Sequence, residues 1–333
     1  MPISSNATYV PTMDDFLAHW ASVNAAPDGG GELILKNGEI LGDLRGQRLA
    51  LLALQGEILS ARNDAQIARA AIEQGKALLN AVLNKFNDTL DAYFSGLPLA
   101  AVRPLVPQLT AAQQDFTNPM RDALDVWRRI NAVSPAPAGV TLPLTLPNPA
   151  GGRLDRAGFE ALVNALTDAY ATLRAAENSL KIRREERTGL HSAIRDLLKL
   201  YRQAVAARFL DNHPLVLALP RLSPPEGGRT PAPVAASAVL VPPDTAKIVH
   251  EASDDPDIKE YQLRGVPGSE WSAEDAVTIA THQPGDAREF ITPFSLTQPG
   301  AAASFAVYVI LDTGHEKGSA PMTVTRPLTP AEQ

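Results

Sequence analysis

Two long stretches of the chain carry apolar residues at helical spacing and contain no proline. They run from Asp43 to Gly96 and from Asp155 to Leu210. Apolar positions step by four and three along each, at Leu79, Leu83, Phe86, Leu90 and Tyr93 in the first and at Ile194, Leu198, Tyr201, Val205 and Phe209 in the second. This spacing is typical of a helix packed lengthwise on another helix, so we predict a long helix in each stretch.

The middle of each long stretch is polar, as in the run from Lys181 to Arg187. Two interpretations follow: each helix continues with its middle in water, or the chain folds back as a hairpin near Gly75 and Gly189. Because an isolated glycine costs a helix only about 1 kcal/mol, we favour continuous helices.

A shorter helix is expected before each long one. Thr12 is placed to cap a helix that carries Phe16 and Trp20, and Thr110 is placed to cap one that carries Trp127. Pro119 lies within the second and is expected to kink or interrupt it, because proline lacks the N–H that a helix interior uses.

The two halves of the helical region match position by position. Trp20 and Asn24 correspond to Trp127 and Asn131 at an offset of 107 residues. In the long stretches the offset is 115, and the matched pairs are Asn63 with Asn178, Leu79 with Ile194, Leu83 with Leu198, Phe86 with Tyr201 and Phe94 with Phe209. The change of offset falls in the connecting loop, where insertions are best tolerated. We therefore predict a tandem duplication.

The predicted organisation is multidomain, α then β. An N-terminal tail (1–11) precedes helical repeat 1 (12–108) and helical repeat 2 (109–222), which pack together as one tandemly duplicated long-helix bundle. We expect each tryptophan to pack its short helix onto the long helix of the same repeat, and each asparagine to close a helix end. The alternative is a twofold-repeated site for a ligand or partner. The link at 33–38 can form an Asn-Gly hairpin, whereas prolines disfavour one at 140–144.

Residues 223–234 are rich in proline and glycine and read as a linker. Beyond it the apolar period changes from helical to alternating. The expected strands are Ala238–Val241, Ala246–Glu251, Ile258–Arg264, Ala276–Thr281, Arg288–Thr292, Ser304–Leu311 and Pro321–Arg326. Seven short antiparallel strands within 235–327 predict a β-sandwich, followed by a C-terminal tail (328–333).

This C-terminal third resembles fibronectin type III modules. The run Val249–Ser253 with Tyr261–Arg264 is similar to their second and third strands, and Phe305–Val309 with Gly314 to their sixth strand and the following turn. His250 stands where the family usually has a core tryptophan, and Phe305 where it usually has a tyrosine. The resemblance implies a spacer or a protein-contact module. The helical part resembles no family that we recognise.

Composition narrows the function classes. The net charge of −7 resides from Arg221 onward, where 8 Lys and Arg face 15 Asp and Glu. No segment is strongly basic, which argues against nucleic acid as a partner. The chain has no cysteine, and neither a signal peptide nor a membrane-spanning run is visible, so the default expectation is cytoplasmic, with non-classical export left open.

Candidate chemistry is sparse. The six histidines, at 19, 191, 213, 250, 282 and 315, show no ligand spacing. Asp254, Asp255 and Asp257 are interpreted as a solvated turn rather than a calcium site, and Gly29–Gly31 as a flexible turn rather than a phosphate loop. Asn6 and Asn87 begin glycosylation triplets of a kind common by chance. We therefore assign no catalytic, cofactor-binding or metal-binding residue, and expect no cofactor.

The leading functional hypothesis is a non-catalytic structural, scaffold or adaptor protein whose helical body carries an acidic docking module. Its partner would be another protein or a second copy. One alternative is a membrane-acting, pore-forming-like protein that inserts Leu215–Leu219 or Val140–Leu146. Another is an enzyme without a visible motif.

Overall fold

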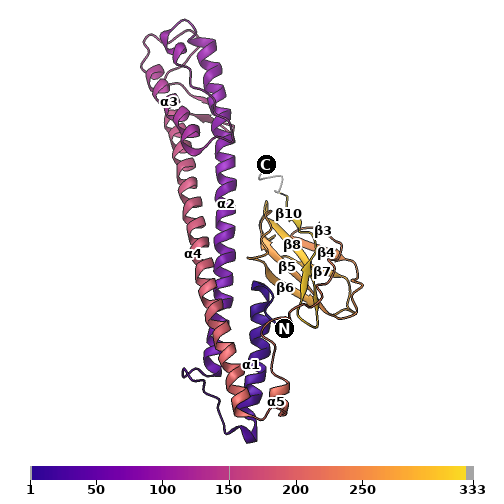
Figure 1. Ribbon diagram of the computed structural model, residues 1–333. Coiled ribbons are helices and arrows are strands. Elements are labelled where there is room, and N and C mark those ends of the chain that lie inside the picture. Colours follow the sequence, from indigo (N-terminus) through magenta and orange to yellow (C-terminus); the bar gives the residue numbers. More distant parts are fainter. Residues whose placement is uncertain (1, 150, 328–333) are drawn as a thin grey trace. The chain divides into compact units, whose positions relative to one another are not determined.

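The computed structural model describes residues 2–149 and 151–327 (Figure 1); the tail expected at 328–333 lies outside them. The chain is helical up to about residue 217 and forms antiparallel sheets beyond it. Two compact units divide it. One combines the residues up to Asn63 with those from Ser179 onward, and the other is Asp64–Asn178. Both long helices contribute to both units.

The long helices are α2 (Leu41–Tyr93) and α4 (Arg156–Arg208), each of 53 residues. Neither Gly75 nor Gly189 interrupts them. The favoured interpretation of continuous helices therefore agrees with the structure, and the hairpin alternative does not.

The short helices begin elsewhere than expected. Helix α1 (Tyr9–Ala25) starts before Thr12, whose hydroxyl donates to the Thr8 carbonyl at 2.7 Å instead of capping the helix. Pro11 is tolerated in the first turn because N–H groups there have no partner within the helix. Helix α3 (Gln113–Asn131) follows Ala112, so Thr110 is not its cap, and Pro119 lies inside it without interrupting it.

Short elements connect the helices. They are η1 (Asn6–Thr8), η2 (Pro27–Gly29), η3 (Pro98–Val102), α5 (Pro214–Leu217) and the pair β1 (Leu146–Pro147) and β2 (Arg153–Leu154). The expected hairpin at 33–38 is only a turn, in which Gly38 donates to the Leu35 carbonyl at 2.8 Å. Strand pairing in the second link occurs beyond 140–144, at β1 and β2.

The sheet region has two antiparallel sheets. The first has the order β3 (Ala236–Val241), β4 (Thr245–His250), β7 (Glu289–Thr292). The second has the order β10 (Met322–Thr325), β8 (Ala302–Leu311), β5 (Ile258–Pro267), β6 (Val277–His282), with β9 (Glu316–Gly318) also paired to β8. Each of the seven expected segments overlaps a strand. β9 is additional, because the chain turns at Gly314 and pairs with Tyr308–Ile310 before β10 begins.

Three apolar cores support these elements. One lies among the sheets and includes Ile248, Leu263, Phe290 and Phe305. A second lies within Asp64–Asn178, around Phe86 and Trp127. The third joins α1 to the end of α4, around Trp20, Tyr201 and Val205. Each helical core therefore combines one short helix with residues of both long helices, since Phe159 and Val163 of α4 belong to the second core and Leu44 and Leu51 of α2 to the third.

Candidate docking interface between the helices and the sheets

Strands β5 and β8 are buried on both faces, although an antiparallel sheet of a sandwich ordinarily exposes one. The second face of β5 carries Glu260, Gln262 and Arg264, all at most 8% exposed. Polar side chains are rarely buried without partners. This face is therefore built to lie against other protein groups.

The chain's N-terminal segment covers part of this face. The Arg264 guanidinium donates to Glu316 Oε2 at 2.6 Å, to Gln262 Oε1 at 2.8 Å and to Ser5 Oγ at 3.2 Å. It also lies 4.0 Å from the ring centre of Tyr308. Arg264 is thus a buried, fully partnered cation that ties residues near the N-terminus to the sheets.

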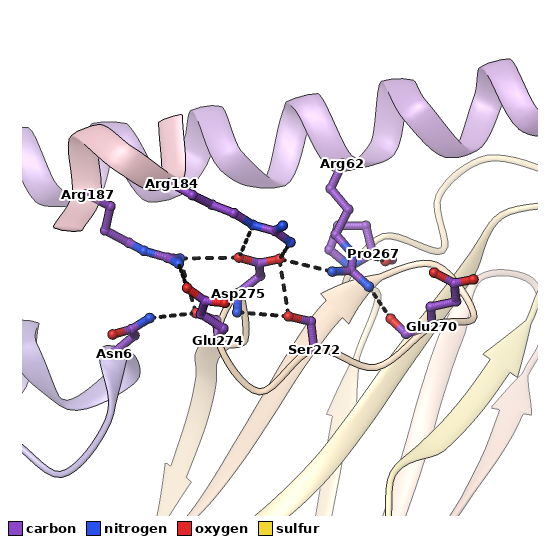
Figure 2. A network of polar contacts seen from close by, with 9 residues as sticks. All are labelled: Asn6, Arg62, Arg184, Arg187, Pro267, Glu270, Ser272, Glu274 and Asp275. Atoms are coloured by element: carbon purple, nitrogen blue, oxygen red, sulfur yellow. Dashed lines mark hydrogen bonds and ion pairs between the residues drawn. The ribbon is translucent and has the colours of Figure 1, made fainter. Parts of the chain in front are cut away.

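The long helices bind the same module around the Asp275 carboxylate, shown in Figure 2, and Arg187 Nη2 also donates to Glu274 Oε1 at 3.2 Å. Asp275 has no exposed side-chain surface and faces three arginines. Its oxygens accept from Arg62 Nη1 on α2 at 3.1 Å, and from Arg184 Nε at 3.1 Å and Arg187 Nη1 at 3.4 Å on α4. Arg184 also donates through Nη2 to the second oxygen. One acidic side chain therefore joins both long helices to the loop before β6.

Backbone contacts surround this carboxylate. Arg62 Nε donates to the Pro267 carbonyl at 3.1 Å, and Arg187 Nη1 and Asn6 Nδ2 both donate to the Glu274 carbonyl at 3.1 Å. The Asp275 amide donates to Ser272 Oγ at 3.3 Å, which shapes the loop that presents the carboxylate. We call Arg62, Arg184, Arg187 and Asp275 the arginine–aspartate latch.

Electrostatics favour the charged form of the latch. Burial alone would raise the pKa of the Asp275 carboxyl, but hydrogen bonds and positive charge from Arg184, Arg187 and Arg62 outweigh it and hold the pKa below its usual range. Removing one partner from such a buried ion-pair network is strongly destabilising, because the remaining charges stay buried without compensation.

One turn beyond Arg187, His191 packs against α1. Its ring stacks on Tyr9 with centroids 3.6 Å apart and 6° between planes, and its Nε2 is buried without a hydrogen-bond partner. Burial, with the charges of Arg187 and Arg195, lowers the pKa of His191 to about 4. The imidazole is therefore neutral at pH 7, and protonating it would place a third positive charge along this side of α4.

The two matched tryptophans occupy equivalent environments. Trp20 on α1 stacks on Tyr201 of α4 at 4.5 Å, and Trp127 on α3 stacks on Phe86 of α2 at 5.1 Å; neither indole is exposed. The expectation that each short helix packs on the long helix of its own predicted repeat describes only part of the packing: Trp127 also lies 5.8 Å from Phe159 of α4, and Leu44 and Leu51 of α2 share the core around Trp20. The matched residue that each ring meets lies on the other long helix.

The matched asparagines accept equivalent hydrogen bonds. Asn24 Oδ1 accepts from the Leu33 amide at 2.9 Å, and Asn131 Oδ1 accepts from the Leu144 amide at 2.8 Å. Each side chain thereby fastens the link that follows its short helix. These buried structural roles favour the packing interpretation of the Trp and Asn pairs over a repeated ligand site.

The segments that leave the long helices are held in a matched way. We call residues 94–112 the first exit segment and residues 209–223 the second. In the first, Asn87 donates to the Pro104 carbonyl and Asn80 to the Pro107 carbonyl. In the second, Arg202 at the position matching Asn87 donates to the Pro220 carbonyl. Arg195, at the position matching Asn80, donates to Ser223 Oγ.

The histidines singled out by sequence are structural where buried. His19 bonds the Tyr201 hydroxyl at 2.6 Å and the Leu215 carbonyl at 2.8 Å. His250 packs against Tyr261 at 4.6 Å between centroids, at the position that the family resemblance assigned to the core. In the described part of the chain, no three His, Asp or Glu side chains lie together as metal ligands would.

The other candidate residues also have structural partners. Asp255 is buried, bonds the Ala232 amide and pairs with Arg229, so the expected solvated turn is wrong for this carboxylate. Asn87 is 1% exposed, which leaves its triplet inaccessible to glycosylation. The apolar candidates for insertion are also packed: Leu144 and Leu146 are buried, and Leu215 lies against the core around Trp20.

The latch leaves no recognisable pattern in the sequence. The run from Lys181 to Arg187 was interpreted as lying in water, yet Arg187 is 3% exposed and Arg62 is 8% exposed. Nothing in the sequence joins Arg62 to Asp275, which lies 213 residues later. A buried arginine and a solvated one look alike in a sequence, and the charge surplus beyond Arg221 was the one available signal.

No protein-family model and no curated protein sequence matches the chain. Among solved structures, an Fn3-like protein from Clostridium thermocellum is 23% identical, with a TM-score of 0.24, over 30% of this chain and 98% of its own; the match lies in the C-terminal part. The pectate lyase PelI of Erwinia chrysanthemi, solved with tetragalacturonic acid, is 15% identical with a TM-score of 0.24. Pel3 of Pectobacterium carotovorum is 12% identical with a TM-score of 0.21. The chain spans 28% of PelI and 25% of Pel3.

Proposed function

We propose that this chain is a non-catalytic structural or adaptor protein in which the β-sandwich is held in a fixed position against the two long helices. The arginine–aspartate latch is the observation that carries the proposal. A freely moving head on a linker would keep its charged residues in water, whereas Asp275 is buried beneath arginines from both long helices. The protein's work would then be to hold surfaces at fixed positions.

The helical region is proposed to be a tandem duplication. Its support is the agreement of three independent contact types at matched positions: Trp on the opposite long helix, Asn on the following link, and a polar side chain on the exit segment. Chance periodicity accounts for apolar stripes, but not for the same polar bond at the same register. A duplicated body offers two related platforms, of which one carries the sandwich.

Partners are proposed to be proteins or further copies of the chain, in the cytoplasm. Nucleic acid is disfavoured by the charge distribution. No helix in the described residues has the length and apolar character needed to cross a bilayer. A pore-forming activity would require the latch to open and the buried links to leave their cores.

The latch proposal is tested by measuring a distance across it. Because the chain has no native cysteine, spin labels can be placed at Glu185→Cys on α4 and Ala287→Cys on the sandwich, two exposed positions. A single narrow distance distribution is expected from electron–electron resonance. A broad distribution would show that the sandwich moves relative to the long helices, which would contradict the proposal. Release of a dye from liposomes by the unlabelled protein would favour the membrane-acting alternative.

A further inference from the structure

The charges of the latch are divided between the helices and the sandwich. Arg62 on α2 and Arg184 and Arg187 on α4 supply the positive side. Figure 2 shows all three side chains reaching toward the Asp275 carboxylate. The side chains of Arg62 and Arg187 are 10% and 4% exposed. Arginines buried this deeply need an anion beside them, and the loop before β6 brings it to the helices.

The positions that match the latch arginines in the other predicted repeat carry different charges. At the offset of 115 residues there are three matched pairs, and they are Arg62 with Glu177, Arg184 with Arg69, and Arg187 with Ile72. The latch positions are all positive, whereas the matched set sums to zero because one glutamate cancels one arginine. The two sets therefore differ in the charge that a docking loop has to bring.

The long helices themselves pair the charges of the matched set. Arg69 Nη2 on α2 donates to Glu177 Oε1 on α4 at 2.9 Å, and these side chains are 48% and 44% exposed. Ile72 is 6% exposed and packs in the core around Trp127. At these positions the anion comes from a long helix, and the ion pair lies at the surface.

Residue 62 is the position that separates the two sets most strongly. Arg184 and Arg69 have the same charge, and the change from Arg187 to Ile72 only removes a charge. The change from Arg62 to Glu177 reverses the sign. A carboxylate like that of Asp275, placed beside Glu177, would meet a like charge and compete with it for Arg69. Like charges brought together exclude a partner as effectively as good contacts select one.

We infer that the charge of residue 62 determines which of the two matched helix surfaces receives the sandwich. Arg62 makes the surface around Arg184 an acceptor for a carboxylate presented on a loop, and Glu177 closes the matched surface to the same loop. The inference rests on the proposed duplication and on the proposed fixed position of the sandwich. It adds the chemistry by which the helices recognise the sandwich.

The test is the variant Arg62→Glu in the full-length protein that carries the spin labels at Glu185→Cys and Ala287→Cys. The new carboxylate is expected to pair with Arg184, as Glu177 pairs with Arg69, and to repel Asp275. The distance distribution, narrow in the labelled parent, should then broaden. The matched control is Arg62→Gln, which removes the charge but keeps an N–H donor for the Pro267 carbonyl, the acceptor of Arg62 Nε at 3.1 Å. Its distribution should stay narrow.

A second measurement needs no spin label. Asp275→Asn is expected to lower the melting temperature of the parent, because it removes the anion from the arginines. In the Arg62→Glu background the same substitution removes a repulsion, so it should raise the melting temperature or leave it unchanged. Circular dichroism at low temperature extends this comparison to a poorly folded Arg62→Glu protein, in which Asp275→Asn should maintain or increase the helix content.

Three results would overturn the inference: a narrow distribution in Arg62→Glu, equal broadening in Arg62→Gln and Arg62→Glu, or a loss of stability on Asp275→Asn that is the same in both backgrounds. A distribution that is already broad in the labelled parent would contradict the fixed position itself, and the inference with it. A narrow parent together with a narrow Arg62→Glu would contradict the inference alone.

Discussion

The two helical cores use one plan and end differently. Around Trp20 and around Trp127, a short helix is stacked on an aromatic ring of a long helix, an asparagine fastens the next link, and a side chain of the long helix holds the exit segment. The exit segments then diverge. In the second, Leu215 and Leu219 pack against the core around Trp20 while Leu210 and Leu217 stay exposed; in the first, Leu105 and Leu109 are exposed. In this protein, therefore, hydrogen bonds that hold the backbone of a segment do not require the side chains of that segment to be buried.

The largest expected effect comes from separating the two predicted repeats. Neither residues 1–108 nor residues 109–220 should fold well alone, because Trp20 lacks Tyr201 in the first fragment and Trp127 lacks Phe86 in the second. An isolated amphipathic helix rarely persists without its packing surface. Mixing the fragments should restore helix content, measured by circular dichroism. Fragments that are each fully helical and cooperative would mean that the contacts across the repeats are dispensable.

Truncating the tryptophans compares the two cores directly. Trp20→Ala and Trp127→Ala should each destabilise the protein by about 3–5 kcal/mol, because both indoles are unexposed. Trp→Phe should then separate the cores. Trp127 Nε1 donates to the Leu144 carbonyl at 3.1 Å, whereas Trp20 Nε1 is buried without a partner.

Trp127→Phe should therefore cost about 1–2 kcal/mol more than Trp20→Phe, since only it leaves a buried carbonyl without its donor. Urea unfolding of both variants measures the difference. Equal costs would show that the Leu144 carbonyl finds water or another donor. Tryptophan variants with wild-type melting temperatures would instead support the ligand-site interpretation.

Breaking the latch should affect one unit and spare the other. Asp275→Asn leaves three buried or half-buried arginines without their anion, and we expect a loss of about 3–5 kcal/mol of stability. The spin-label distance from Glu185→Cys to Ala287→Cys should broaden at the same time. Asp254→Asn, an exposed aspartate of the same sandwich, is the control and should change neither. A narrow distance in Asp275→Asn would show that the Arg264 face alone holds the sandwich.

The smallest predicted effect is a dependence on pH. The pKa of His191 is lowered to about 4 in the folded protein, so the unfolded chain binds its proton first. Stability from this group is complete above about pH 6.5 and is lost as pH falls toward 4. We expect about 2 kcal/mol after allowance for solvent screening.

His191→Phe keeps a ring against Tyr9 and should flatten that part of the profile in urea unfolding at pH 7 and 4.5. Asp275 adds a further loss at lower pH, because its folded pKa is also depressed and its stabilisation disappears as the carboxylate is protonated. An unchanged profile in His191→Phe would assign the acid sensitivity to other groups, among them His19 and His250, whose pKa values burial also lowers.

The sequence predicted the elements better than the contacts between them. Apolar spacing located both long helices and all seven expected strands, because periodicity follows directly from which side of an element is buried. Helix starts were missed at Thr12 and Thr110, because α1 begins at Tyr9 after Thr8 and α3 begins at Gln113 after Ala112, neither with a side-chain cap. The latch was missed because the partner of Arg62 lies far away in the chain and forms no local pattern. The stacking of each tryptophan on the other long helix was missed because matched repeats offer two long helices, and each short helix packs on both.

The bonds to the Pro104, Pro107 and Leu109 carbonyls have a consequence for how the protein can change over time. Every residue type has a carbonyl, so this fastening does not depend on which side chains the segment carries. Residues 105, 106 and 109 can therefore be exchanged for others while Lys76, Asn80 and Asn87 keep the chain in place. The exposed side chains of this segment can therefore change in sequence while the core beneath it stays the same.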